Sequence, residues 1–195
     1  MEAIIPPVER ELLRAELTPE RKARDTKKAG NEIYIFSAAE CPSLMREIGR
    51  LREIAFRGAG GGTGKDLDID AEDLAEDGYY QLIVWDPAAE EIVGGYRFII
   101  CTDEYPRHLS TEHYFRFSDK FRRKYLPRTI ELGRSFIVNE YQRKPVSLML
   151  LWKGILNVLL RHDEFRYLMG PVTISGEFQN SSKLLIAAYL RNRHL

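Results

Sequence analysis

Short blocks of alternating apolar and polar residues begin after residue 31 and predict regular elements. Residues 32–36 (EIYIF) alternate and are rich in aromatic and β-branched side chains, which predicts a strand. Pro42 then opens a segment whose apolar residues recur at helical spacing, which predicts a helix. The apolar residues on one face of that helix are Leu44, Ile48, Leu51 and Ala55.

Two longer apolar runs follow a glycine-rich segment. Residues 79–85 (YYQLIVW) and 91–101 (EIVGGYRFIIC) are separated by Asp86 and Pro87, which favour a turn. We therefore expect an antiparallel hairpin, followed after a long irregular insert by a strand over residues 129–138 (TIELGRSFIV).

The last third of the chain predicts a helix, a strand and a helix. Pro145 stands at a helix start, and residues 148–160 are apolar nearly all round, which is typical of a buried helix. A short strand is expected near residues 167–175 and a helix over about 180–190. The order of elements predicts a mixed α/β (α+β) domain with one central sheet flanked by helices.

Residues 1–30 are highly charged and differ in pattern from the rest. Apolar residues at helical spacing follow Pro6 and Pro7, and Thr18 with Pro19 forms a second helix-start signal. We expect a mobile helical arm over residues 1–30 and a single domain over 31–195. The arm is either a solvated extension or a helix that docks on a partner or a membrane surface.

Composition and charge exclude several classes of protein. The 195 residues are 44% hydrophobic and 30% charged, which fits one globular domain. Lys+Arg and Asp+Glu number 29 each, so no overall positive field favours nucleic acid. Cys41 and Cys101 have no zinc or disulfide spacing, which favours a reducing, cytoplasmic setting. The sequence has no pattern typical of a signal peptide or membrane span.

The segment 57–73 (RGAGGGTGKDLDIDAED) is rich in glycine like a phosphate-binding loop, but it does not match the motifs of such loops. A GxxxxGK[ST] loop requires glycine at position 59 and a hydroxyl at 66, where this chain has Ala59 and Asp66. A GxGxxG pattern ends at Thr63 instead of glycine, and a helix, not a strand, precedes it. A nucleotide-binding loop is therefore not expected.

The acidic part of this segment has the spacing of a calcium loop only in its first half. Asp66, Asp68 and Asp70 have the 1, 3, 5 spacing, but Ala71 and Asp77 occupy the positions of the required glycine and glutamate. A calcium site and a solvated acidic turn both remain open. The four histidines are scattered, so no metal site is predicted.

Short motifs in a fixed order give a more specific hypothesis. They are LREIAF, DIDAED, IVGGYRF, ELGRSFI and LLWKGI. In this order they resemble the acyl-carrier-protein-dependent N-acyltransferases of the GNAT superfamily. The nearest branch is the ornithine-lipid and glycine-lipid type, also labelled hemolysin-like, with acyl-homoserine-lactone synthases as more distant relatives. The resemblance runs from about residue 32 to 189.

The chain departs from the family pattern in two places. The branch has an aromatic residue between its two aspartates, whereas this chain has Ala71 and Glu72 between Asp70 and Asp73. A complete GNAT domain also continues past the last helix into further strands, so we expect this sequence to be truncated at its C-terminus.

The resemblance implies catalytic roles for three residues. Glu131 is the candidate general base, directly or through water, and Arg134 helps to hold the active site together. Tyr189 lies near the position of a tyrosine that protonates the leaving thiolate. The alternatives are an ion pair of Glu131 with Arg97 or Arg52, and a packing role for Tyr189.

The resemblance also implies a substrate site, whose residues are Arg52, Phe56, Asp70, Asp73 and Arg97. The two aspartates either attract a substrate ammonium or anchor the two arginines in a charge network. We expect the intervening glycines to form a mobile flap over the acceptor and the acyl chain.

The acyl donor is expected at the end of a bulged strand and the start of the following helix. Residues 139–147 lack the glycine-rich form that cradles a diphosphate, which agrees with the single phosphate of a carrier protein. Arg143, Lys144 and Ser147 are the candidate donor contacts. We expect no permanently bound cofactor; the donor is acyl carrier protein, as its 4'-phosphopantetheine thioester, or acyl-CoA.

The implied activity is N-acylation of a small amino acid. A 3-hydroxy fatty acyl group would pass from acyl carrier protein to the α-amine of glycine or ornithine, giving an N-acyl amino acid lyso-lipid. The expected partners are the carrier protein and the amino acid, with peripheral contact at the inner membrane face. The alternatives are an enzyme like an acyl-homoserine-lactone synthase and a non-catalytic module that binds carrier protein.

Overall fold

A computed structural model describes residues 1–25, 30–102, 109–142, 145–162, 164–174 and 176–194. Within these residues one sheet has six strands in the order β1-β2-β3-β4-β5-β6. Neighbouring strands from β1 to β5 are antiparallel, and β5 and β6 are parallel. The strands are β1 Lys22–Asp25, β2 Glu32–Ser37, β3 Tyr80–Asp86, β4 Glu91–Cys101, β5 Thr129–Ile137 and β6 Tyr167–Met169.

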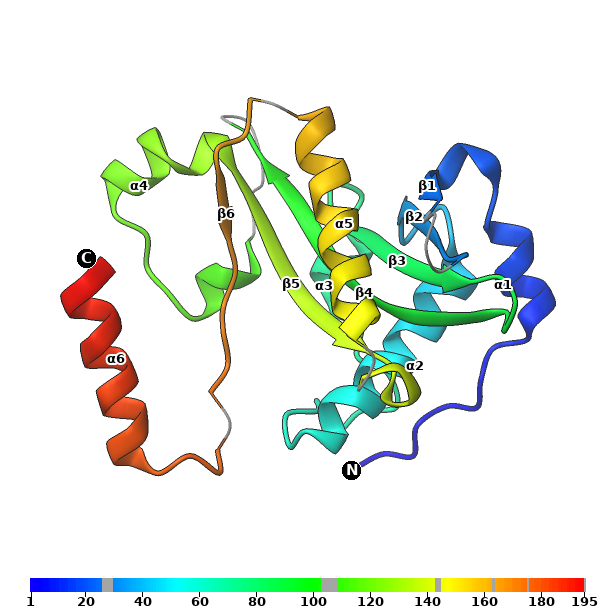
Figure 1. Ribbon diagram of the computed structural model, residues 1–195, viewed down its shortest axis with the longest axis horizontal. Coiled ribbons are helices and arrows are strands. Elements are labelled where there is room, and N and C mark those ends of the chain that lie inside the picture. Colours follow the sequence, from blue (N-terminus) through cyan, green and yellow to red (C-terminus); the bar gives the residue numbers. More distant parts are fainter. Residues whose placement is uncertain (26–29, 103–108, 143–144, 163, 175, 195) are drawn as a thin grey trace.

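Helices lie on both faces of this sheet (Figure 1). They are α1 Arg10–Glu16, α2 Pro42–Gly58, α3 Ala71–Leu74, α4 Asp119–Lys124, α5 Pro145–Arg161 and α6 Asn180–His194. The short 3-10 turns are η1 Pro19–Arg21, η2 Ser110–His113, η3 Leu126–Arg128 and η4 Asn139–Tyr141. The predicted mixed α/β class is therefore confirmed, as are the predicted hairpin and its flanking strands.

Alternation along the strands divides the core into two layers. In β3, Leu82 and Val84 pack with α5, whereas Ile83 and Trp85 pack with α2 on the opposite face. The predicted apolar face of α2 is buried in that second layer. Because successive strand residues point to opposite faces, one central strand supplies both cores.

Helix α5 differs from its prediction on its outer face. The sheet-facing residues are buried, but the residues of the opposite stripe are exposed in the described structure. That stripe consists of Leu148, Met149, Trp152, Leu156 and Leu160. The prediction of burial all round is wrong here because the sheet covers only one side of the helix.

The hairpin brings backbones into close contact at two glycines. A Cβ on Gly95 would lie 2.5 Å from the Leu82 carbonyl oxygen, and one on Gly94 would lie 2.5 Å from the Phe136 carbonyl oxygen. Since both neighbours are backbone atoms, a larger residue cannot be accommodated by moving a side chain. This explains the Gly-Gly pair in the motif IVGGYRF.

A bulge interrupts the pairing of β4 and β5. Gly95 pairs with Phe136 and Arg97 pairs with Gly133, so β5 has one extra residue between these pairs. Arg134 lies within the bulge with φ of 51°, a left-handed conformation that is uncommon for a side-chain-bearing residue. A helix, α5, follows this bulged strand, which is the arrangement implied by the family resemblance.

Residues 1–25, set apart in the sequence as an arm, contact the rest of the chain. Strand β1, which has no alternating pattern in the sequence, pairs with β2. Leu13 of α1 is buried in the α2 layer. The Glu16 carboxylate accepts hydrogen bonds from the backbone N–H groups of Ser43 and Leu44 at 2.9 and 2.8 Å, and so caps the start of α2.

In the described part of the chain, helices are too short or too polar to cross a lipid bilayer.

Candidate active site

A buried charge network links α2, α3 and β3. Arg52 of α2 is fully buried, and its Nη1 lies 3.2 Å from Asp73 Oδ2. Its Nη2 donates to Gln81 Oε1 at 2.6 Å, while Gln81 Nε2 donates to Asp73 Oδ1 at 2.9 Å. The three side chains therefore form a closed ring of hydrogen bonds in which one positive and one negative charge are paired.

Arg97 extends this network across β4. Its Nη1 lies 2.6 Å from Asp70 Oδ1 and 3.0 Å from Asp73 Oδ2. Its guanidinium lies over the ring of Tyr79, 4.4 Å from the centroid, which adds a cation–π contact. Asp70 and Asp73 form a capping box at the start of α3, so one helical turn presents both carboxylates to Arg97.

The bulge brings Arg134 into the same network. Its guanidinium lies 2.8 Å from Asp68 Oδ1 and 3.2 Å from Asp70 Oδ2. In a regular strand Glu131 and Arg134 would point to opposite faces, but the extra residue shifts this alternation. Arg134 thus ties the bulge of β5 to the segment before α3.

Burial and charge act in opposite directions on the carboxyl groups of this network. Burial acts to raise the pKa of Asp70, but the hydrogen bond and the charge of Arg97 outweigh it and hold that pKa well below its ordinary value. For Asp68, burial outweighs the attraction of Arg134 and raises the pKa. Asp70 is therefore the firmly charged member, held between two arginines.

Glu131 lies in a second polar cluster, which is joined to the charge network through Tyr79. Its side chain is fully buried. Oε1 accepts hydrogen bonds from the Tyr79 hydroxyl at 2.9 Å, the Ser110 hydroxyl at 2.7 Å and the Thr111 backbone N–H at 3.1 Å. Among the described residues, Oε2 has no hydrogen-bond partner.

Residues around Glu131 titrate far from their ordinary range. Burial, together with the neighbouring Glu131 carboxylate, raises the pKa of Tyr79, so this phenol stays protonated and donates. Burial and Glu131 likewise raise the pKa of Cys101 to about 12, which makes this thiol a poor nucleophile. The cluster is thus built around one carboxylate and neutral donors.

The glycine-rich segment encloses a side chain of the protein itself. Thr63 donates to Glu53 Oε2 from its backbone N–H at 2.9 Å and its hydroxyl at 2.7 Å, and the Gly64 N–H donates to Oε1 at 2.8 Å. Gly64 adopts a φ of 79°, which glycine tolerates without strain. The segment that resembled a phosphate loop therefore binds an internal carboxylate.

This packing counts against the predicted mobile flap. Arg57 also holds the segment, donating to Glu53 Oε1 at 2.9 Å and to the Lys65 carbonyl at 2.7 Å. Burial acts to raise the pKa of Glu53, but the hydrogen bonds from Thr63, Arg57 and Gly64 lower it to about 2. A charged carboxylate with this many donors is a fixed anchor rather than a hinge.

Other residues of the predicted site lie elsewhere or cannot be placed. Phe56 packs against the α2 core layer. Ser147 is buried in the first turn of α5, whereas Arg143 and Lys144 lie outside the described residues. Tyr189 is 60% exposed on α6, which stands apart from the sheet in Figure 1, and its ring contacts Arg193. Among the described contacts, none joins Tyr189 to the Glu131 cluster.

Sequence reasoning missed several members of these clusters. Gln81 and Tyr79 belong to an apolar run that predicted only a strand, although a glutamine inside such a run was a signal. Ser110 lies in the irregular insert, where no periodicity marks it. No metal-binding group of three or more His, Cys, Asp or Glu occurs in the described part of the chain, and Asp68 and Asp70 contact arginines.

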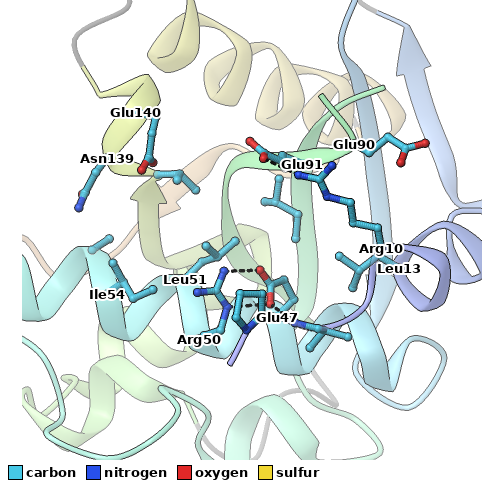
Figure 2. Close-up of a pocket in the computed structure, with 15 residues that line it drawn as sticks. Arg10, Leu13, Glu47, Arg50, Leu51, Ile54, Glu90, Glu91, Asn139 and Glu140 are labelled. Atoms are coloured by element: carbon cyan, nitrogen blue, oxygen red, sulfur yellow. Dashed lines mark hydrogen bonds and ion pairs between the residues drawn. The ribbon is translucent and has the colours of Figure 1, made fainter. Parts of the chain in front are cut away.

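A cavity of about 340 Å³ lies beside α2, away from these clusters (Figure 2). Its walls come from the N-terminal segment, α2, the start of β4 and the residues after β5. Apolar side chains of α1 and α2 line it together with charged side chains such as Arg10, Glu47 and Glu140. Glu47 and Arg50 are paired at 2.6 Å. The cavity shares no lining residue with the predicted site.

Comparison with protein families assigns the fold. Residues 51–153 match the family described as "Acetyltransferase (GNAT) domain". The chain belongs to this GNAT family. The matched range includes the whole charge network, the bulged strand and the first part of α5, so the resemblance drawn from the ordered motifs is confirmed at the level of the superfamily.

Two curated relatives of this GNAT chain have the same name. A "Glycine N(alpha)-acyltransferase" of Bacteroides thetaiotaomicron is 47% identical, over 98% of this chain and 60% of the relative. A protein of that name from Phocaeicola vulgatus is 43% identical, over 100% of this chain and 63% of the relative. The chain thus spans about three fifths of the length of the curated relatives it matches.

Among solved structures, the AHL synthase LasI has a similar fold. The TM-score is 0.53 at 16% identity, covering 82% of this chain and 78% of that chain. At this identity the likeness concerns the fold alone.

Proposed function

We propose that the protein is an N-acyltransferase that moves a 3-hydroxy fatty acyl group from acyl carrier protein to the α-amine of glycine. The observation that carries this proposal is the 47% identity, over 98% of the chain, to a relative named glycine N(alpha)-acyltransferase. Glycine therefore takes precedence over ornithine as acceptor. The product, an N-acyl glycine lyso-lipid, is amphiphilic, so we place the enzyme in the cytoplasm with peripheral contact at the inner membrane face.

The site geometry supports amide formation from a thioester. The amine nitrogen bonds to the thioester carbonyl carbon, the C–S bond breaks, and the amine gives up a proton. Glu131 is the proposed general base, since it is a buried carboxylate near the start of the bulged strand. We assign a framework role to Arg52, Asp73 and Arg97, because their charges are already paired with one another.

The donor site is proposed near the bulge of β5 and the start of α5. A bulge takes backbone groups out of the strand ladder and leaves them free for a ligand. The proposed contacts for the donor phosphate are Ser147, in the first turn of α5, and Arg143 and Lys144, which come shortly before it in the sequence. Acyl-CoA is the alternative donor, and no permanently bound cofactor is required.

The test is a turnover assay with purified full-length protein. Donors are 3-hydroxyacyl carrier protein and acyl-CoA, acceptors are glycine, ornithine and S-adenosylmethionine, and products are measured by mass spectrometry. We expect N-acyl glycine from the carrier-protein donor. Product only with S-adenosylmethionine would indicate a synthase of homoserine-lactone type instead.

Glu131→Gln separates an enzyme from a module that only binds carrier protein. Loss of the base should lower kcat by ~10² or more, while the affinity for acyl carrier protein stays unchanged. Glu11→Gln, at an exposed position on α1, is the control and should keep wild-type turnover. Full activity of Glu131→Gln would refute the role of this base.

A further inference from the structure

We propose that Ser110 is a catalytic residue, which takes the proton from the acceptor amine and passes its own proton to Glu131. This inference rests on the proposed N-acyltransferase function and goes beyond it, because Ser110 belongs to none of the motifs that the family resemblance contains. In this role Ser110 connects the buried Glu131 carboxylate to a surface that substrates can reach.

The burial of Glu131 sets the problem. Its side chain is 0% exposed, so an amine cannot contact it without displacing a neighbour. Ser110 is partly exposed, and its hydroxyl oxygen lies 2.7 Å from Glu131 Oε1. Tyr79, the other hydroxyl on Oε1, is only 1% exposed. Among the described residues that donate to Glu131, Ser110 is therefore the one that is not fully buried.

The hydrogen bonds determine the acceptor to which each hydroxyl proton points. An ionised carboxylate only accepts, so the hydroxyls of Ser110 and Tyr79 both donate to Oε1. The Tyr79 oxygen in turn accepts from the Ser110 backbone N–H at 2.9 Å. The Ser110 proton thus points at Glu131. The Tyr79 hydroxyl lies 3.2 Å from the Ser110 oxygen, which leaves one lone pair of that oxygen to accept a hydrogen bond from an amine.

The turn η2 holds Ser110 in this position from several sides. The Thr111 N–H donates to the same oxygen of Glu131 at 3.1 Å. Glu112 forms an ion pair with Arg122, and His113 Nε2 lies 2.6 Å from Glu72 Oε1 on α3. A serine held in this way needs little reorganisation to take part in proton transfer. Tyr79 is a positioning residue that orients both Ser110 and Glu131.

Protons pass between the reacting groups and Glu131 through Ser110. As the amine nitrogen bonds to the thioester carbonyl carbon, one N–H bond breaks and a new O–H bond forms on Ser110. The original Ser110 proton moves to Glu131 Oε1 at the same time. When the C–S bond breaks, a proton returns from Glu131 through Ser110 to the departing sulfur. The products are an amide and a thiol, and both side chains regain their starting forms.

The experiment compares two substitutions of equal shape in the full-length protein. Ser110→Thr keeps the hydroxyl, whereas Ser110→Val replaces it by a methyl group. Steady-state kcat and KM for glycine are measured with 3-hydroxyacyl carrier protein, and Tm is measured for each variant. Ser118→Ala, at the exposed N-cap of α4, is the matched control for loss of a nearby serine hydroxyl.

We expect Ser110→Val to have a kcat at least tenfold below that of Ser110→Thr, toward the ~10²-fold that a positioned proton-transfer group contributes. KM for glycine should be alike in the two variants. Tm should be lower for Ser110→Val, because it loses one hydrogen bond to the buried Glu131 carboxylate, so kcat is compared at a temperature at which both variants are folded. Ser110→Ala, which is smaller, should match Ser110→Val and guards against misfolding of the larger side chain.

Two results would overturn the proposal in distinguishable ways. Equal kcat values for the Thr, Val and Ala variants, with an active wild type, would remove Ser110 from the mechanism and leave the N-acyltransferase function intact. Absence of N-acyl product from the wild type with every donor and acceptor would refute the proposed function, and the role of Ser110 with it.

Discussion

At the scale of single residues, the molecule places several charges where water cannot reach them. Arg52 and Asp73 are both buried completely, and each is paired. Taking two ions out of water is costly, and that cost is offset by the pairing, by the hydrogen bonds of Gln81 and by the contact of Asp73 with Arg97. Removing one partner should therefore destabilise the fold far more than replacing both partners with apolar residues would.

Asp73→Asn tests the cost of removing one partner of this buried ion pair. The substitution leaves Arg52 buried without its counter-charge, so we expect the free energy of unfolding to fall by about 3 to 5 kcal/mol. The measurement is urea denaturation of the purified chain. Asp119→Asn is the control, because Asp119 is exposed and its pair with Arg123 is 3.7 Å long; it should change stability by less than about 0.5 kcal/mol. Similar values for both variants would contradict a buried pair.

The ordered motifs predicted which residues belong to this network but not how they meet. Arg52, Asp73 and Arg97 came from short patterns in the sequence, and the structure brings them together. Gln81 was missed because its position opposite Arg97 depends on the register of β3 and β4, which a single sequence does not fix. Ser110 depends likewise on how the insert folds back onto β5.

At the scale of elements, the glycine-rich segment acts as a binding loop for Glu53. From the sequence alone, the acceptor for its backbone N–H groups could be a phosphate or solvent. In the structure the acceptor is a glutamate on the preceding helix. No motif marks that glutamate. Sequence reasoning therefore had no means of finding the internal ligand.

Glu53→Gln should reveal this loop through its pH dependence. The folded pKa of Glu53 lies below its ordinary value of 4.5, at about 2. A lowered carboxyl pKa stabilises the fold above the unfolded pKa, and this stability is lost as the pH falls through the folded pKa. The stability advantage of wild type over Glu53→Gln should be full at pH 7 and should decline from about pH 4.5 toward pH 2.

Urea unfolding at pH 7, 4 and 3 measures this advantage. Glu76→Gln changes an exposed carboxylate beyond α3 and should differ little from wild type at every pH. A constant difference between wild type and Glu53→Gln across the range would show that the loop does not bind the charged carboxylate.

The hairpin of β3 and β4 makes a second prediction at this scale. Gly95→Ala would place a Cβ 2.5 Å from the Leu82 carbonyl oxygen, so the strands must move apart. We expect a loss of about 1 to 3 kcal/mol in the free energy of unfolding. Gly58→Ala, at the end of α2, meets nothing within 4 Å and should be neutral or slightly stabilising. Thermal and urea unfolding of both variants decide the matter.

At the scale of the whole molecule, the sequence predicted the α/β class and the order of the main elements. The alternating and helical periods of β2, α2, β3 and β4 are strong because each of these elements faces a packed core on at least one side. Strand β1 was missed, since an edge strand of four residues takes its structure from pairing with β2 rather than from its own pattern. The outer face of α5 was predicted to be buried because the helix is apolar nearly all round. Such a sequence does not tell which side of the helix a neighbouring element covers.

The two tryptophans report on that outer face in the 195-residue chain. Trp85 is 3% exposed in the core, whereas Trp152 on α5 is 55% exposed. In Trp152→Phe, the remaining Trp85 should emit at shorter wavelength and resist quenching by acrylamide. In Trp85→Phe, the remaining Trp152 should emit at longer wavelength and be quenched readily, since water and acrylamide reach an exposed indole. If Trp152 is instead protected from acrylamide and dilution of the protein restores quenching, a second copy of the chain covers α5. If the protection persists on dilution, a segment of the same chain covers α5, and the stripe described as exposed is in fact buried.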